Sequence, residues 1–232
     1  MAQHIDIQLW IPVDRTWKAR GVPLVIDRRG NAWLEGHVAI QHSRLLLDDY
    51  LGQQRLTCCS FQGGFAIDVD GVRWNEGGID EFWMTMHWFE GLNRVLRGGA
   101  IATAVTSVWE ESWLVLHRHG DTLTFHDGYA PPFVHPPVSV NLWAFAACLL
   151  RAGRVLEQLI ARIKYEIEER GFDIAELLAG SQQAPDDTPL ALLREKMRII
   201  VKELPGRADF ALLDETQRLL EQQGASDSNP TL

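Results

Sequence analysis

A long helical periodicity in the second half of the chain constrains the fold more than any other feature. Apolar residues recur every three or four positions between residues 142 and 167: Leu142, Phe145, Leu149, Ala152, Leu156, Ile160, Ile163 and Ile167. This spacing predicts a long amphipathic helix, with Ser139 or Asn141 as its N-cap and Gly171 at its end. The apolar face must be buried, either against the rest of the chain or against a second copy of it.

The N-terminal part of the chain carries strand patterns instead. Apolar residues alternate there with polar ones, at Ile5, Ile7, Leu9 and Ile11. This period of two predicts a strand with one buried face that ends at Pro12. Turn sequences at residues 28–31, 70–71 and 119–121 each separate two strand-like runs, so we expect three β-hairpins.

Three further segments complete the predicted architecture. Residues 37–47 favour a strand, with a helix through Tyr50 as the alternative. A helix is predicted between an N-cap at Asp80 and the glycines at 98 and 99. Two more helices are predicted near the C-terminus, one with an apolar face from residue 190 to 204 and one over 209–223.

The expected fold class is therefore α+β, with a mainly antiparallel sheet and a packed helix in the N-terminal part and a helical C-terminal part. We expect residues 1–137 to form the sheet-rich unit and residues 138–223 to pack on it. Residues 224–232 read as a flexible tail.

Charge and cysteine content limit the classes of function. The chain has 31 acidic and 22 basic residues, a formal charge of −9, and 46% hydrophobic residues. Clustered Lys and Arg are missing, so nucleic acid is not an expected partner. Three cysteines, two of them adjacent at Cys58 and Cys59, favour free thiols in a reducing cytoplasm.

The sequence shows no signal-peptide pattern and no membrane-spanning run, so we expect a cytoplasmic protein.

One short motif has the spacing of a metal site. His117, His119 and Asp121 fit the pattern H-x-H-x-D, in which two imidazoles and a carboxylate hold a metal for hydrolysis. His126, Asp127 and His135 follow closely. The metallo-β-lactamase pattern has a second His directly after the Asp, where this chain has Thr122. The residues therefore favour a polar hairpin tip and no cofactor, with a metal-dependent hydrolase as an alternative.

Acidic residues recur beside aromatic ones. The chain has 9 tryptophans, at least half of which we expect to be mainly buried, but several lie next to carboxylates. Aromatic anchors rimmed by charge are typical of protein-binding hot spots. The candidate partner-binding residues are Asp48, Asp49, Glu76, Asp80, Glu81, Trp83, Trp109, Glu110 and Glu111.

Residues 82–126 resemble small bacterial immunity proteins of polymorphic toxin systems. The segments that carry the resemblance are Phe89-Glu90-Gly91-Leu92, Leu96-Arg97-Gly98-Gly99, Val108-Trp109-Glu110-Glu111-Ser112, Leu114 and Gly120-Asp121-Thr122-Leu123. The resemblance implies a non-enzymatic protein that binds and blocks a cognate toxin, with no catalytic residues. An acidic inhibitor would be steered electrostatically onto a basic toxin. The alternative is an accessory protein that forms homo-oligomers through its long amphipathic helices.

Overall fold

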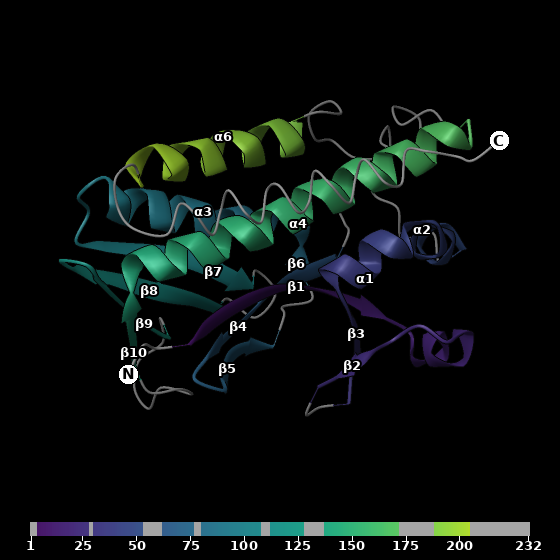
Figure 1. The fold of residues 1–232 in the computed structure, drawn as a ribbon, viewed down its shortest axis with the longest axis horizontal. Helices are drawn as coiled ribbons and strands as arrows, with labels where there is room; N and C mark the ends of the chain where they lie inside the picture. Colours follow the sequence, from purple (N-terminus) through teal and green to yellow (C-terminus); the bar gives the residue numbers. More distant parts are fainter. Residues whose placement is uncertain are drawn as a thin grey trace.

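The structure is a computed structural model that describes residues 4–27, 30–52, 62–76, 80–107, 112–127, 137–171 and 188–204. Two antiparallel sheets form one layer, and the long helices lie together on one side of it (Figure 1). The expected α+β class is confirmed. Among the helices in these ranges, none combines the length and the apolar character needed to cross a bilayer.

The first sheet is built mainly from the N-terminal hairpins. Its strand order is β2-β3-β1-β4-β5, and β6 pairs with β4. The strands are β1 (Ile5–Val13), β2 (Val25–Ile26), β3 (Ala32–Glu35), β4 (Gln62–Val69), β5 (Val72–Glu76) and β6 (Asp80–Glu81). Alternate residues of β1 are buried as predicted, but the strand does not end at Pro12. Pairing with β3 continues to Val13, since a proline lacks only the donor of its ladder position.

The second sheet is a four-stranded meander. Its order is β10-β9-β8-β7, with β7 (Ile101–Ser107), β8 (Ser112–His119), β9 (Thr122–Asp127) and β10 (Val138–Asn141). The three predicted hairpins are confirmed: β2 pairs with β3, β4 with β5 and β8 with β9. At the β4–β5 turn, Asp70 and Gly71 both have positive φ, 52° and 79°. Two such residues in sequence match the right-handed twist of the flanking strands, which explains the preference for Asp-Gly there.

The prediction of a strand over residues 37–47 was wrong. The chain forms two helices instead, α1 (Gly36–Gln41) and α2 (Ser43–Gly52), as in the stated alternative. Buried residues lie at Ala39, Ser43, Leu46 and Leu47. Their spacing of four, three and one is that of buried helical faces, Ala39 on α1 and the other three on α2, and not the alternation of a strand.

The three longer helices are α3 (Phe82–Leu96), α4 (Leu142–Glu169) and α6 (Thr188–Glu203). The first two pack on the sheets, and α6 packs on α3 and α4. Of the two candidate caps of α4, Asn141 is used, and its side chain accepts hydrogen bonds from the backbone N–H groups of Trp143 and Ala144. The predicted cap of α3 was wrong: Asp80 belongs to β6, which pairs with the start of β4, and the helix begins after Glu81.

A continuous core joins both sheets to the helices. Phe145 of α4 has ring contacts with Phe125 of β9 and with Trp88 of α3. The apolar face of α4 contacts β1, β9 and β10 and is thereby committed to the core of its own chain. Five tryptophan side chains are described, and Trp10, Trp17, Trp33 and Trp88 are buried. The predicted helix over 209–223, the tail over 224–232 and the cysteines 58 and 59 lie outside the described residues.

Candidate functional site

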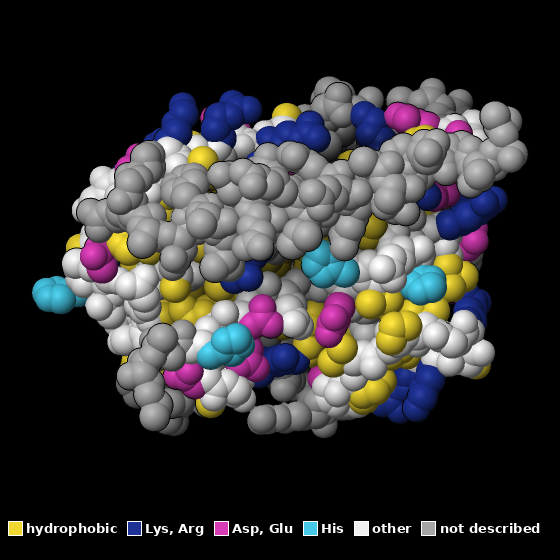
Figure 2. Space-filling model, in the orientation of Figure 1, with side chains coloured by type: hydrophobic (Ala, Val, Ile, Leu, Met, Phe, Trp, Pro, Cys, Tyr) yellow, Lys and Arg dark blue, Asp and Glu magenta, His cyan; other side chains and the backbone are white. Residues whose placement is uncertain are grey.

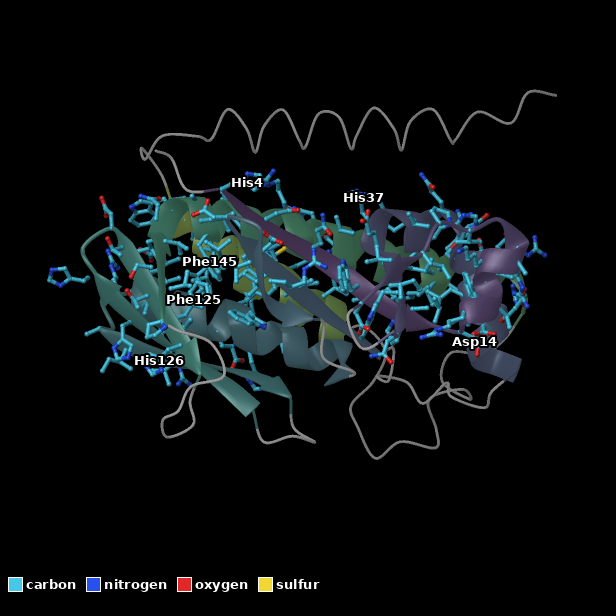
Figure 3. All side chains as sticks on the ribbon, turned by 90° about the horizontal axis from the view of Figure 1, so that it is seen from below. His4, Asp14, His37, Phe125, His126 and Phe145 are labelled. Carbon is cyan, nitrogen blue, oxygen red and sulfur yellow. The ribbon has the colours of Figure 1, made fainter. Side chains whose placement is uncertain are left out.

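The two faces of the four-stranded sheet differ in what covers them. Side chains alternate along each strand. Leu116 and Phe125 point inward and are fully buried, while His117 and His126 lie on the opposite face. Figure 3 shows Phe125 beside Phe145 in the core, and His126 turned away from them at the outer surface. The inward face is part of the core, and the outward face carries the candidate site.

The register of the sheet arranges the outward residues in a row. Ile101 lies opposite His117, His117 opposite Thr124, and Thr124 opposite Ser139. Directly opposite residues of antiparallel strands project from the same face. Ile101 is 60% exposed, and the hydroxyls of Thr124 and Ser139 are hydrogen-bonded at 2.7 Å. With Val115 and His126, these residues define the open face: Ile101, Val115, His117, Thr124, His126 and Ser139. None of the six carries a carboxylate or an ammonium group.

Two imidazoles meet at the centre of the open face. His126 lies two residues beyond the direct partner of His117, which is the diagonal position within reach of a long side chain. The Nε2 atoms of His117 and His126 are 3.1 Å apart, and the rings are inclined by 21°. One Nε2 donates and the other accepts, so the neutral pair holds one hydrogen between these two atoms.

The H-x-H-x-D residues do not converge on one point. The side chain of His117 turns to His126, whereas His119 and Asp121 are exposed at the end of the β8–β9 hairpin. Among the described side chains, no group of three or more His, Cys, Asp or Glu residues could hold a metal ion. His135 lies outside the described residues. The backbone at residues 119–121 forms the hairpin tip that the sequence favoured.

The acidic and aromatic candidates are only partly within the described residues. Asp48, on α2, is bound at 2.6 Å by Arg170, next to the end of α4, and neighbouring Asp49 is half-buried. The backbone places Glu76, Asp80, Glu81 and Trp83 on β5, β6 and α3, but their side chains lie outside the description, as does the segment of Trp109, Glu110 and Glu111. The described atoms therefore assemble no single acidic and aromatic surface from these nine.

Indoles near charged groups occur at positions that the sequence pattern missed. Trp33 donates its Nε1–H to Asp27 at 3.0 Å, and Arg73 lies over the ring of Trp10 at 4.2 Å. Trp10 and Trp33 are buried on the side of the first sheet that faces away from the main core. The first contact crosses the β2–β3 hairpin and the second joins β5 to β1, so residues directly adjacent in sequence gave no signal for them.

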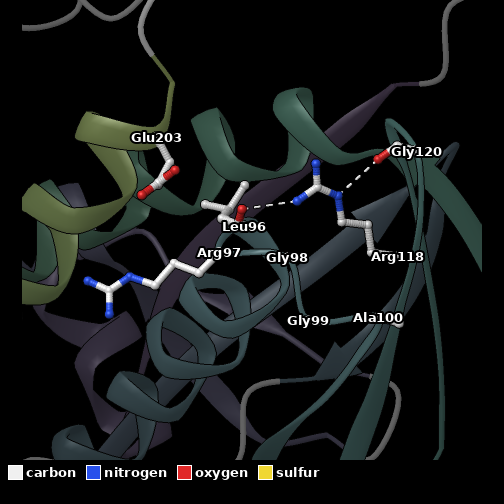
Figure 4. A pocket seen from close by; sticks show the side chains of 8 residues that line it. All are labelled: Leu96, Arg97, Gly98, Gly99, Ala100, Arg118, Gly120 and Glu203. Atoms are coloured by element: carbon white, nitrogen blue, oxygen red, sulfur yellow. Dashed lines mark hydrogen bonds between the residues drawn. The ribbon is translucent and has the colours of Figure 1, made fainter.

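A shallow cavity of about 660 Å³ lies at the C-terminal end of α3 (Figure 4). Its lining residues are Leu96, Arg97, Gly98, Gly99, Ala100, Arg118, Gly120 and Glu203. Arg118 donates to the carbonyls of Val95 and Leu96 at 2.6 and 3.0 Å and to that of Gly120 at 3.0 Å. These hydrogen bonds satisfy backbone acceptors at the helix end, so Arg118 acts as a C-terminal cap of α3.

Charged side chains fasten α6 to the other helices. Lys196 donates to Glu90 of α3 at 2.7 Å, and this hydrogen bond is the main cause that lowers the pKa of Glu90. Burial alone would raise the pKa of Glu157 on α4, but bonds from Arg194 and Arg154 outweigh it and lower that pKa. Figure 2 shows further Lys and Arg side chains along the edge of the molecule where α6 lies. The basic residues of α6 thus serve partly to hold the helix in place.

Comparisons with known proteins gave no relatives for this architecture: no family model, no curated protein and no solved structure matches the chain.

Proposed function

We propose that this protein is a non-catalytic inhibitor of the immunity type, which neutralises a cognate toxin by binding it. The observation that carries the proposal is the open face: a sheet whose inward side is sealed by helices presents an uncharged outward side with an exposed Ile101. Charged residues are depleted at the centres of protein interfaces, and such a face has that character. The residues at 76–83 and 109–111 remain candidates for additional contacts.

The net charge supports a basic partner. A formal charge of −9 accelerates the encounter with a positively charged protein, while contacts at an uncharged centre hold the complex together. Toxins that attack nucleic acid inside cells carry positive charge, because their substrate is a polyanion. The partner we infer is therefore a basic protein toxin.

The test is neutralisation of the cognate toxin, which the proposal expects among the products of the genes adjacent to this protein's gene. The purified protein should abolish the activity of that toxin at a one-to-one ratio, and the affinity can be measured by titration calorimetry. Ile101→Arg should weaken binding at least about tenfold, equivalent to about 1.4 kcal/mol, since it sets a positive charge against a basic partner.

A matched control is available at Val72, which is 55% exposed on the first sheet. Val72→Arg makes the same change of charge at a similar exposure, and it should leave the affinity unchanged. If the toxin stays fully active in the presence of the parent protein, the proposed function is wrong. An equal loss of affinity in both variants would exclude the open face as the binding surface.

A further inference from the structure

We propose that His117 and His126 form a binding site for one borderline transition-metal ion, Zn²⁺, Ni²⁺ or Cu²⁺, on the open face. This inference is independent of the toxin-binding proposal, because it depends only on the geometry of the two imidazoles. The site differs from the H-x-H-x-D motif, since His119 and Asp121 take no part in it.

The separation of the two nitrogens is the first argument. Metal–nitrogen bonds to histidine are about 2.0 to 2.1 Å long, so two ligands at angles between 90° and 109° lie about 2.8 to 3.4 Å apart. The measured Nε2–Nε2 distance of 3.1 Å falls within this range. Binding therefore requires the two rings to rotate until both Nε2 lone pairs point at the ion, at a nitrogen–nitrogen distance that the structure already has.

The strand register makes this arrangement rigid. The β8–β9 ladder pairs residues continuously from Leu114 and Asp127 to His119 and Thr122, so the diagonal relation of the two histidines is fixed by the hairpin. The next positions inward, Leu116 and Phe125, are anchored in the core. A pre-organised pair of ligands loses little conformational entropy when the ion binds.

The chemistry of the pair defines the ion. Neutral imidazole is a ligand for zinc, nickel and copper, whereas calcium and magnesium require oxygen ligands. For the ion to bind, the hydrogen on the donating Nε2 moves to Nδ1 of the same ring, which frees both Nε2 lone pairs. The described side chains supply two of the ligands, His117 and His126.

Zinc titration of the untagged full-length protein tests this inference. In calorimetry the parent should bind one Zn²⁺ at the pair. His117→Ala and His126→Ala should each weaken that binding at least about tenfold. His119→Ala is the matched control, because it removes an exposed imidazole from the same strand and should keep the parent affinity.

Two further readouts require no variant of the pair. In ¹H–¹⁵N spectra of the parent, zinc should shift the imidazole signals of His117 and His126 together, leaving those of His4 and His37 in place. The Tm should also rise with zinc concentration, since the ion binds the folded state. Absence of zinc binding by the parent, or the same loss in His119→Ala as in the pair variants, would overturn the inference and leave only a hydrogen-bonded imidazole pair.

Discussion

Gly153 of α4 lies in close contact with side chains of two other helices, α3 and α6. A Cβ atom at this residue would lie 2.6 Å from the ring of Phe89 on α3 and 2.8 Å from the sulfur of Met197 on α6. Real side chains do not tolerate such distances without displacing a neighbour. The glycine therefore permits close packing at the cost of a weaker helix.

Replacing Gly153 with Ala should destabilise the protein by about 1–3 kcal/mol, because the gain in helix propensity is smaller than the cost of overpacking. Urea unfolding followed by circular dichroism measures the change. Ala161→Gly, on the exposed side of the same helix, provides the control for propensity and should cost about 1 kcal/mol. A Gly153→Ala variant more stable than the parent would contradict the packing shown here.

Single residues were predictable from the sequence where a local rule applied. Asp70-Gly71 as a turn and Asn141 as one of two candidate caps, with Ser139, follow from the conformations that these residue types favour. The meeting of His117 with His126 also follows from position, once the turn at residues 120–121 fixes the register. The role of Arg118 as a C-terminal cap of α3 could not be predicted in this way, because the carbonyls that it binds, at residues 95 and 96, belong to another element.

At the level of elements, α6 depends on its ion pairs as well as on its apolar face. Leu193, Met197 and Ile200 are buried as the periodicity predicts. Glu90 and Glu157 bind this helix from α3 and α4 respectively. Both carboxyls have a pKa below the ordinary value of 4.5, so their charged forms stabilise the fold.

A lowered pKa in the folded state gives stability that is present above pH 4.5 and is lost as the pH falls through the folded-state pKa. Glu90→Gln should therefore reduce the free energy of unfolding at pH 7 by about 0.5 kcal/mol, since this residue is partly exposed, and Glu157→Gln by about 1 kcal/mol. Once the pH is below both the folded-state and the unfolded-state pKa of the carboxyl, each variant should have the same free energy of unfolding as the parent.

Urea unfolding at a series of pH values from 7 downward measures both effects, and Glu169→Gln, on the exposed side of α4, serves as the control. A constant difference between variant and parent at all pH values would mean that the carboxylate charge does not act in this way. Loss of stability in Glu169→Gln at pH 7 would point to a general effect of net charge.

The segment of residues 37–47 shows why some elements could not be assigned from the sequence. A short apolar run fits a strand and a buried helix equally well, because both need only one apolar face. The outcome depends on α4, whose surface accepts the helical face of Ala39 and Leu46. Long periodic segments such as α4 itself leave no such ambiguity.

For the whole molecule, the unifying element is the core around Phe145. Its ring contacts an aromatic residue of the second sheet and one of α3, while other residues of α4 pack on β1. The sequence indicated each of these elements, but it did not indicate that one helix, α4, packs on both sheets. That arrangement depends on contacts between residues far apart in the chain.

A shared core predicts cooperative unfolding of the described sheets and helices. Thermal transitions of the parent followed by far-UV and by near-UV circular dichroism should coincide. Phe145→Ala should lower the free energy of unfolding by about 3–5 kcal/mol and shift both transitions equally. Two separated transitions, with only one sensitive to Phe145→Ala, would show that the sheets unfold independently.

The division of the four-stranded sheet into a sealed side and an open side has an evolutionary consequence. Mutations at alternate positions of β8 and β9 fall under different constraints, because the inward residues maintain the scaffold and the outward ones do not. Substitutions at Ile101, His117, Thr124 and Ser139 can therefore change what the outward side binds while leaving the buried inward residues in place. The binding specificity of the outward side can therefore change during evolution without loss of the buried core that stabilises the fold.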